Sequence, residues 1–158
     1  MIIYYTRSQK TKIFAEALGE ILDRPVYELK SDLGNMKGFR FLIKALGMVF
    51  SNKGFPVSNM PDSVPQEIYV CGPIWGGRLV GPPKYFMENI DLSQTKVNLL
   101  VTAETPVEKY RTRALQDLSQ IKCIPGEAYI FAIKKESMPE KEIAIEHLRM
   151  LLSNEVEK

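Results

Sequence analysis

Hydroxyl side chains and cations stand close together near the start of the chain, in the stretch TRSQKT at residues 6–11. They belong to Thr6, Arg7, Ser8, Lys10 and Thr11, and Lys12 follows. Free N–H groups at a helix N-terminus and short hydroxyl donors together form a site for an anion. A Ser or Thr N-cap would explain one hydroxyl, but neither all of them nor the cations. Because the stretch lacks glycine, it matches neither a P-loop nor a dinucleotide fingerprint, and we interpret it as a site for a terminal monophosphate.

A second unusual stretch is CGPIWGG at residues 71–77. Trp75, the only tryptophan, either covers the core or offers a flat face on which a ligand could stack. Gly76 and Gly77 come next, and glycine allows backbone conformations that are closed to other residues and lets a ligand approach the chain closely. We therefore expect an aromatic-bearing loop beside the anion site.

Alternating strands and helices must position these two stretches. Apolar runs predict strands at residues 2–6, 25–29, 67–72, 96–102 and 128–134. Apolar residues at helical spacing predict helices at residues 10–22, 39–52, 82–90, 107–121 and 140–154. This order is typical of a three-layer α/β fold with a five-stranded parallel sheet that is covered on both faces. Ligands of such sheets bind outside the carboxyl ends of the strands, so the loops after the first, third and fourth strands are the candidate site.

Length and composition narrow the class of protein. The 158 residues suit a single domain spanning 1–158. A net charge of +2 without a basic tract argues against nucleic acid, and no apolar run approaches the roughly 20 residues of a membrane span. Cys71 and Cys123 lie far apart without a neighbouring histidine, which excludes a cysteine-based metal site and favours buried thiols in a reducing compartment. The chain enters a strand at once without a basic leader, so we expect a cytoplasmic protein.

At its two unusual stretches the chain resembles the flavodoxin-like family of FMN-binding proteins. TRSQKT looks like that family's phosphate loop, and GPIWGG with the following PP and F, then DLSQTKVNLLVT, is similar to its next flavin loop, helix and fourth strand. The resemblance implies the strand order 2-1-3-4-5 and FMN as the cofactor, and the uninterrupted fifth strand GEAYIFAIK matches the short-chain form. The phosphate contacts it implies are Thr6, Arg7, Ser8, Gln9, Lys10 and Thr11. The flavin-ring contacts it implies are Pro73, Ile74, Trp75, Gly76 and Gly77, with Ala103, Glu104 and Thr105 as candidates in the third loop.

The chain departs from the family at several of these positions. Gln9 stands where the family's phosphate loop usually has glycine, and the family's usual members lack the cluster of cations. The loop VTAETPVEKY is poor in glycine, and its Glu104 brings a carboxylate near the expected ring edge. No side chains form an acid–base or nucleophilic set, so we expect no catalytic residue.

The resemblance implies an FMN-dependent redox protein that passes electrons to a partner protein or reduces a small-molecule acceptor. The family's familiar electron carriers are strongly acidic, which suits docking to basic partners, so a charge of +2 favours a reductase-like member. The alternative is a flavodoxin-like module that has lost tight FMN binding and serves as a binding or assembly protein. Gln9 and the glycine-poor third loop favour this alternative.

The segment at residues 39–50 is more apolar than a helix that only covers a sheet needs to be. Its polar positions Arg40, Lys44 and Gly47, together with Ser51 just after the segment, form one stripe along the helix. The remaining apolar surface could be covered by the loop at 51–67, pair in a homodimer or partner interface, or meet a membrane surface or hydrophobic substrate. We interpret the cluster KYRTR at 109–113 as a solvated helix face that could also help to dock a phosphate-bearing nicotinamide or an acidic partner. His147 we interpret as structural or solvated.

Overall fold

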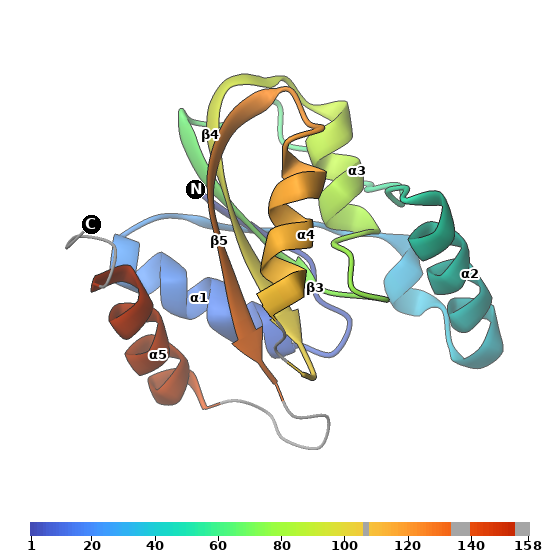
Figure 1. Cartoon of the computed structure of the whole chain (residues 1–158), viewed down its shortest axis with the longest axis horizontal. Helices are drawn as coiled ribbons and strands as arrows, with labels where there is room; N and C mark the ends of the chain where they lie inside the picture. Colours follow the sequence, from blue (N-terminus) through green and yellow to red (C-terminus); the bar gives the residue numbers. More distant parts are fainter. Residues whose placement is uncertain (106–107, 134–139, 154–158) are drawn as a thin grey trace.

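The structure of the chain is a computed structural model that describes residues 1–105, 108–133 and 140–153 (Figure 1). Its strands are β1 (Ile2–Tyr4), β2 (Val26–Glu28), β3 (Glu67–Pro73), β4 (Leu92–Ala103) and β5 (Cys123–Ala132). Its α-helices are α1 (Lys10–Leu22), α2 (Gly38–Ser51), α3 (Pro82–Asn89), α4 (Glu108–Leu118) and α5 (Lys141–Ser153). One short 3-10 helix, η1 (Asp32–Asn35), precedes α2.

The five strands form one sheet in the order β2-β1-β3-β4-β5, and every neighbouring pair is parallel. This confirms the predicted fold class and the strand order that the resemblance implied. The central strand β3 is buried from Ile68 to Gly72, as expected for a strand with helices on both faces. Because the strands are parallel, their carboxyl ends meet at one edge of the sheet, where Tyr4, Cys71 and Thr102 lie near the ends of β1, β3 and β4.

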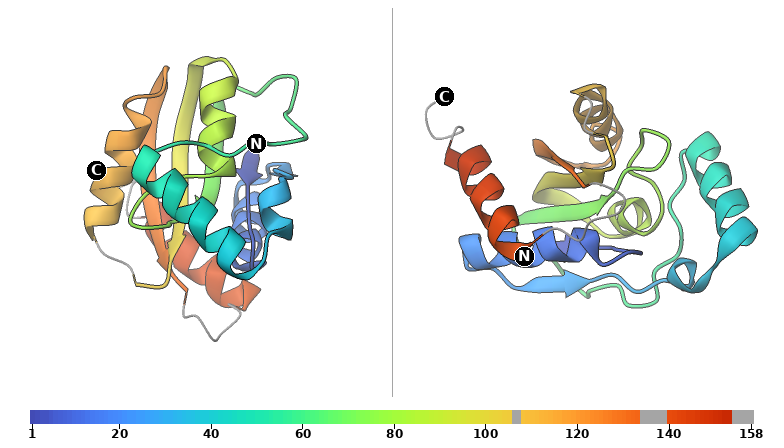
Figure 2. Two further views of the ribbon diagram at one scale, coloured as in Figure 1. Left: turned by 90° about the vertical axis from the view of Figure 1, so that its right-hand side faces the viewer. Right: turned by 90° about the horizontal axis from the view of Figure 1, so that it is seen from below.

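Alternate residues of β1, β3, β4 and β5 belong to two separate cores, one on each face of the sheet. On one face Ile2, Tyr4 and Cys71 pack with Phe14 of α1 and Leu148 of α5. On the other face the core contains residues of β1, β3, α3 and α4, among them Ile3, Val70, Phe86 and Leu118. Figure 2, seen from below, shows the sheet between these two pairs of helices.

Strands β4 and β5 begin several residues before the predicted strands. They extend as a two-stranded ribbon beyond the rest of the sheet (Figure 1), and Leu92 pairs with Cys123 at its start. Register shifts follow Leu92 and Val97, and the polar residues between them hid the strand from an apolar pattern. The other boundaries agree within a few residues, except where 107, 134 and 154 lie outside the described residues. The helix η1 was not predicted; the Ser31 hydroxyl caps it by accepting a hydrogen bond from the Leu33 amide at 3.4 Å.

Helix α2 stands apart from the sheet at one side of the molecule (Figures 1 and 2). Its inner face packs through Ala45 and Met48 on Leu33 and Val80, which form a small third core. Phe55 of the following loop packs beside Ala45 and Met48, but the loop then runs along the edge strand β2, where Asn59 hydrogen-bonds to the Lys30 amide and the Glu28 carbonyl group. The interpretation in which residues 51–67 cover the remaining apolar surface of α2 is therefore wrong, because the outer face of the helix is exposed.

Three further observations bear on the expectations from composition. Cys71 is buried, which raises the pKa of its thiol, whereas Cys123 is only half-buried; both are free thiols. Over 1–105, 108–133 and 140–153, no helix is long and apolar enough to cross a membrane. The same residues contain no group of His, Cys, Asp and Glu side chains that could hold a metal ion.

A cluster of charged and polar groups joins strands at the sheet edge opposite their carboxyl ends. Arg24 Nη2 lies 2.6 Å from Glu67 Oε2, and Asn98 donates a hydrogen bond to Glu67 Oε1 at 3.2 Å. Burial raises the pKa of Glu67, but the hydrogen bonds from Arg24 and Asn98 and the charges of Arg24 and Lys96 outweigh it. The pKa of Glu67 is therefore below its ordinary value of 4.5.

We predict that Glu67 contributes an acid-dependent part of the stability. Because its pKa is lower in the folded than in the unfolded chain, its contribution is present above pH 4.5 and is lost as the pH falls through the folded value. Urea unfolding at a series of pH values should show a shallower loss of stability with acid in Glu67→Gln than in the wild type. Parallel losses in both proteins would contradict this assignment.

Candidate functional site

A cavity of about 590 Å³ opens at the carboxyl edge of the sheet. The loops after β1, β3 and β4, with the adjoining ends of these strands and of α1, form most of its wall, as expected for a parallel sheet, and α2, α4 and the residue after β5 contribute the rest. Among the residues predicted from the sequence, those in its lining are Arg7, Ser8, Lys10, Thr11, Pro73, Ile74, Trp75, Gly76, Gly77, Ala103, Glu104 and Thr105. The lining residues that were not predicted are Phe41, Thr102, Tyr110 and Ile133.

Thr6 and Gln9 are the two predicted residues outside this lining. The Thr6 side chain is buried, and its hydroxyl oxygen has no hydrogen-bond partner among the described residues. Gln9 is exposed and precedes the first residue of α1, but its side chain does not cap the helix. The first N–H groups of α1 therefore keep their capacity to bind an anion, next to the hydroxyls of the same loop.

Thr11 connects the first loop to the end of β4. Its hydroxyl oxygen lies 3.0 Å from that of Thr102, and both side chains are buried. The first turn of α1 is thereby held against β4 at the cavity wall. Thr102 was not identified as a site residue from the sequence, because a β-branched residue is expected in a buried strand. Thr102 does belong to the buried strand β4 and lines the cavity as well.

The cations of the first loop differ in where they point. The Arg7 guanidinium lies over the Phe41 ring, 3.8 Å from its centroid, and donates a hydrogen bond to the Met36 carbonyl oxygen at 3.1 Å. Lys10 lines the cavity. Lys12 lies outside the lining and forms an ion pair with Glu16 at 3.7 Å. The three cations therefore do not act as one cluster: Arg7 connects the loop to α2, Lys10 lines the cavity, and Lys12 lies outside it.

The glycine pair in the second loop forms a tight turn. Trp75 and Arg78 exchange two backbone hydrogen bonds of 3.0 and 3.1 Å across it. Gly76 and Gly77 have φ values of 56° and 79°, which only glycine adopts readily at both central positions of such a turn. Added Cβ atoms would also meet Val49 Cγ1 at 2.6 Å and Arg113 Nη1 at 2.9 Å. The turn thus fits closely between α2 and α4 at the cavity wall.

Trp75 is half-buried and has a packing role as well as a place in the lining. Its ring meets Tyr5 and Phe41 edge-on, with centroid distances of 6.3 and 5.4 Å. Burial raises the pKa of Tyr5 to about 12, so the phenol behind Trp75 is neutral at physiological pH. Trp75 therefore covers part of the core and also lies in the cavity wall, and the stacking of a ligand on its ring stays a prediction.

The third loop brings Ala103, Glu104 and Thr105 to the wall, next to Ile133 at the end of β5. Ala103 is buried, whereas Glu104 and Thr105 are exposed. Tyr110 of α4 also lines the cavity, so the cluster at 109–113 is not only a solvated face. His147 is exposed on α5, which packs against α1 on the other face of the sheet.

Comparison with known proteins finds likeness in structure and not in sequence. No protein-family model and no curated protein matches this chain. A protein of Bacteroides uniformis classed as a flavoprotein matches 94% of this chain over 96% of its own, with a TM-score of 0.74 and 16% identity. The chain has the flavodoxin-like fold.

Two more solved structures have a similar fold. A second protein classed as a flavoprotein, from Bacteroides eggerthii, covers 94% of each chain with a TM-score of 0.68 and 13% identity. A flavoprotein of Lactobacillus acidophilus, crystallised in complex with FMN, matches 84% of this chain over 89% of its own, with a TM-score of 0.55 and 21% identity. At these identities the likeness concerns the fold, and the ligand has to be argued from the residues of this chain.

In this flavodoxin-like chain Gln9 adopts the left-handed conformation for which glycine is suited. Its φ is 64° and its ψ is −7°. A residue with a Cβ atom is strained there by roughly 1–2 kcal/mol. At this position the flavodoxin-like phosphate loop usually has glycine. The backbone here therefore has a conformation that suits glycine, although the residue is Gln9.

We predict that Gln9→Gly raises the free energy of unfolding by up to about 1 kcal/mol, because relief of the strain exceeds the added entropy of the unfolded chain. Urea unfolding of the purified variant measures the change. Ser8→Gly is the matched control, since Ser8 is also exposed but has no positive φ. Equal losses of stability in both variants would show that Gln9 is not strained.

Proposed function

We propose that this flavodoxin-like chain binds FMN in the cavity and works as a redox protein. The observation that carries the proposal is the pairing, in one cavity, of an anion site with an aromatic, glycine-containing wall. The volume of about 590 Å³ lies within the roughly 300–1,000 Å³ that is typical of cofactor sites.

The first loop fits the phosphate group of the cofactor. The Thr11 hydroxyl is already paired with that of Thr102, but the N-terminus of α1 and the residues Ser8 and Lys10 lie together at the wall. These are the donors that hold a phosphate at a helix N-terminus. The buried Thr6 hydroxyl, without a partner among the residues described, gives this loop one further donor that the protein itself does not use.

The second and third loops fit the flavin ring. Pro73, Ile74 and Trp75 supply apolar and aromatic surface, and the turn at Gly76 and Gly77 exposes backbone without side chains at the wall. Ala103 and Thr105 would flank the ring from β4, and Glu104 would bring a carboxylate near its edge. Bound FMN supplies the redox chemistry, while the chain supplies binding, orientation and electrostatics.

The net charge of the chain bears on which kind of electron acceptor it serves. A net charge of +2 gives the chain little of the acidic surface that attracts basic redox partners. We therefore favour a reductase that acts on a small-molecule acceptor over a carrier that passes electrons to a redox partner protein. The two free cysteines favour a reducing compartment such as the cytoplasm.

A visible absorption spectrum tests this function. Purified protein is mixed with FMN, passed through a desalting column and scanned. The proposal expects flavin bands that stay with the protein and bleach on chemical reduction. A colourless protein fraction would contradict tight FMN binding.

The second candidate is a flavodoxin-like module that has lost tight FMN binding and acts as a binding or assembly protein. The specific observations that favour it are the strained Gln9 in the phosphate loop and the guanidinium of Arg7, which is engaged by Phe41 and Met36 instead of facing an anion. This candidate expects the colourless fraction in the experiment above.

A further inference from the structure

The outer face of α2 carries large apolar side chains that none of the described residues covers. Phe39 and Phe50 are 73% and 85% exposed. The remaining members of this face, which we name the α2 apolar face, are Leu42, Ile43 and Leu46. Their spacing of three and four residues places them side by side on the helix. Five neighbouring apolar side chains form a patch of the kind that marks a binding surface.

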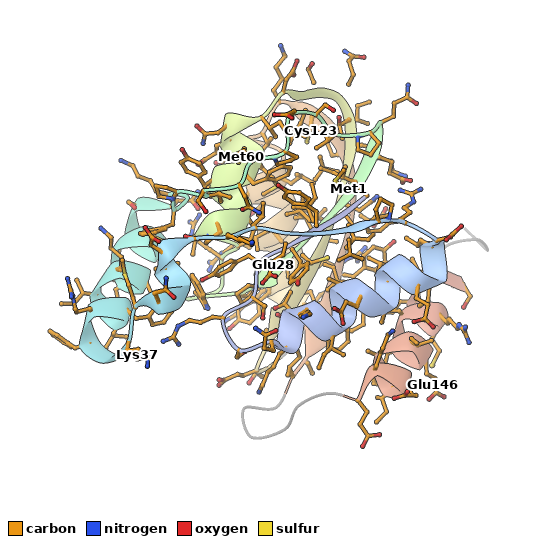
Figure 3. The ribbon with its side chains drawn as sticks, turned by 180° about the vertical axis from the view of Figure 1, so that it is seen from behind. Met1, Glu28, Lys37, Met60, Cys123 and Glu146 are labelled. Atoms are coloured by element: carbon orange, nitrogen blue, oxygen red, sulfur yellow. The ribbon has the colours of Figure 1, made fainter. Side chains whose placement is uncertain are left out.

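The charged residues of the segment that carries this face all have one sign. Residues 33–61 contain no Asp or Glu, but they contain Lys37, Arg40, Lys44 and Lys53. Arg40 and Lys44 form the stripe beside the α2 apolar face, and Figure 3 shows Lys37 on the outside of the molecule at the start of the helix. None of these cations forms an ion pair within the part of the chain that the structure describes.

We infer that the α2 apolar face and its cations dock the protein onto an anionic lipid surface. A helix with large apolar residues on one face and cations beside them lies in the plane of the lipid headgroups, where acidic lipids neutralise the cations. A second copy fits less well, because a symmetric contact through this face would bring Arg40 and Lys44 against their own counterparts with no acid in the segment to pair them. The helix lies on the membrane and does not span it, in agreement with its length of 14 residues.

Docking in this way would hold the cavity close to the membrane. The opposite side of α2 reaches the cavity wall through Phe41, which contacts both Arg7 and Trp75. One helix therefore separates the docking face from the site. The inference concerns docking alone and does not depend on the cofactor in the cavity.

Vesicle co-sedimentation of the full chain tests the inference. We expect binding to vesicles of phosphatidylcholine and phosphatidylserine in equal amounts, weaker binding to phosphatidylcholine alone, and release by added salt. Arg40→Glu with Lys44→Glu should weaken binding to the acidic vesicles by roughly tenfold or more. Phe39→Ser with Phe50→Ser should weaken it at least as much.

Ile143→Ser with Met150→Ser is the matched control, because these side chains are 47% and 59% exposed on α5, away from the α2 apolar face. It should bind as the wild type does, and circular dichroism checks that every variant is folded. Lack of binding by the wild-type chain, or equal binding to both kinds of vesicle, would overturn the inference. A dimer that becomes a monomer in the Phe39 and Phe50 variant, without vesicle binding, would overturn it in favour of a contact between copies.

Discussion

Lys10→Glu should weaken the binding of FMN by roughly thirtyfold, or about 2 kcal/mol, and leave the binding of riboflavin nearly unchanged. The reason is that Lys10, the first residue of α1, lines the cavity where our account places the phosphate of FMN. Replacing it exchanges an attraction for a repulsion at this one end of the ligand. Quenching of flavin fluorescence measures both dissociation constants in the same protein, so a general loss of fold would affect both ligands.

Lys12→Glu is the matched control for this prediction. Lys12 is two residues further along α1, lies outside the cavity lining and pairs with Glu16. We expect its replacement to change FMN affinity by less than about threefold, because at that distance only a screened electrostatic interaction with the ligand remains. Equal losses for Lys10→Glu and Lys12→Glu, or equal losses for FMN and riboflavin, would show that the first loop does not hold the phosphate.

The second large effect concerns the contact that places α2 beside the site. Gly54→Ala should lower the free energy of unfolding by about 2 kcal/mol or more. A Cβ atom at Gly54 would overlap the backbone nitrogen and Cα of Tyr85 in α3, and backbone cannot turn aside as a flexible side chain can. Gly54 also pairs with Gly81, whose amide donates a hydrogen bond to the Lys53 carbonyl oxygen at 3.4 Å. Thermal unfolding should show the midpoint falling by roughly 5 °C.

Replacement of Gly47 by alanine, seven positions earlier, should change the free energy of unfolding in the opposite direction. Gly47 is an exposed residue within α2, and a Cβ atom added there meets nothing within 4 Å. Because glycine in a helix costs about 0.5–1 kcal/mol relative to alanine, Gly47→Ala should stabilise the protein by that amount. If both variants were stabilised, the close contact between Gly54 and Tyr85 would not exist in solution.

Most of the fold could be predicted from the sequence because two-sided burial leaves a clear pattern. The continuous apolar runs of β3 and the centre of β4, and the helical spacing in α1, gave the elements directly. The start of the β4–β5 ribbon could not be found in this way. Its residues between Leu92 and Lys96 are polar, and they lie at an irregularity in the pairing with β5, between the pairs Leu92 with Cys123 and Lys96 with Ile124.

The part of the candidate site that could be predicted is the part formed by loops with unusual residue types. Hydroxyls before a helix and a Trp-Gly-Gly turn stand out in the sequence, and the topology brings them to one edge. Phe41, Tyr110 and Ile133 carry no such signal, since each is an apolar or aromatic residue of an element whose position relative to the cavity depends on tertiary packing. The direction of the Arg7 side chain is likewise a tertiary feature, because it depends on the ring of Phe41 and the carbonyl group of Met36.

The surplus of apolar residues in α2 was visible in the sequence. Whether these residues are exposed or covered depends on the path of the next loop. Tyr27 donates a hydrogen bond to the Asn59 carbonyl oxygen at 2.7 Å, and Ser58 bonds to Lys30. These contacts hold the loop along β2 and leave the outer face of α2 free of it. No local pattern in residues 51–67 distinguishes this path from one that returns over the helix.

Titration of the protein with FMN, followed by the fluorescence of Trp75, tests the central claim most directly. Trp75 is the only tryptophan and lies in the cavity wall, so it reports on this site alone. The account predicts saturable quenching at micromolar FMN. Unchanged fluorescence over that range, with no flavin retained by the protein, would contradict the placement of the cofactor in this cavity.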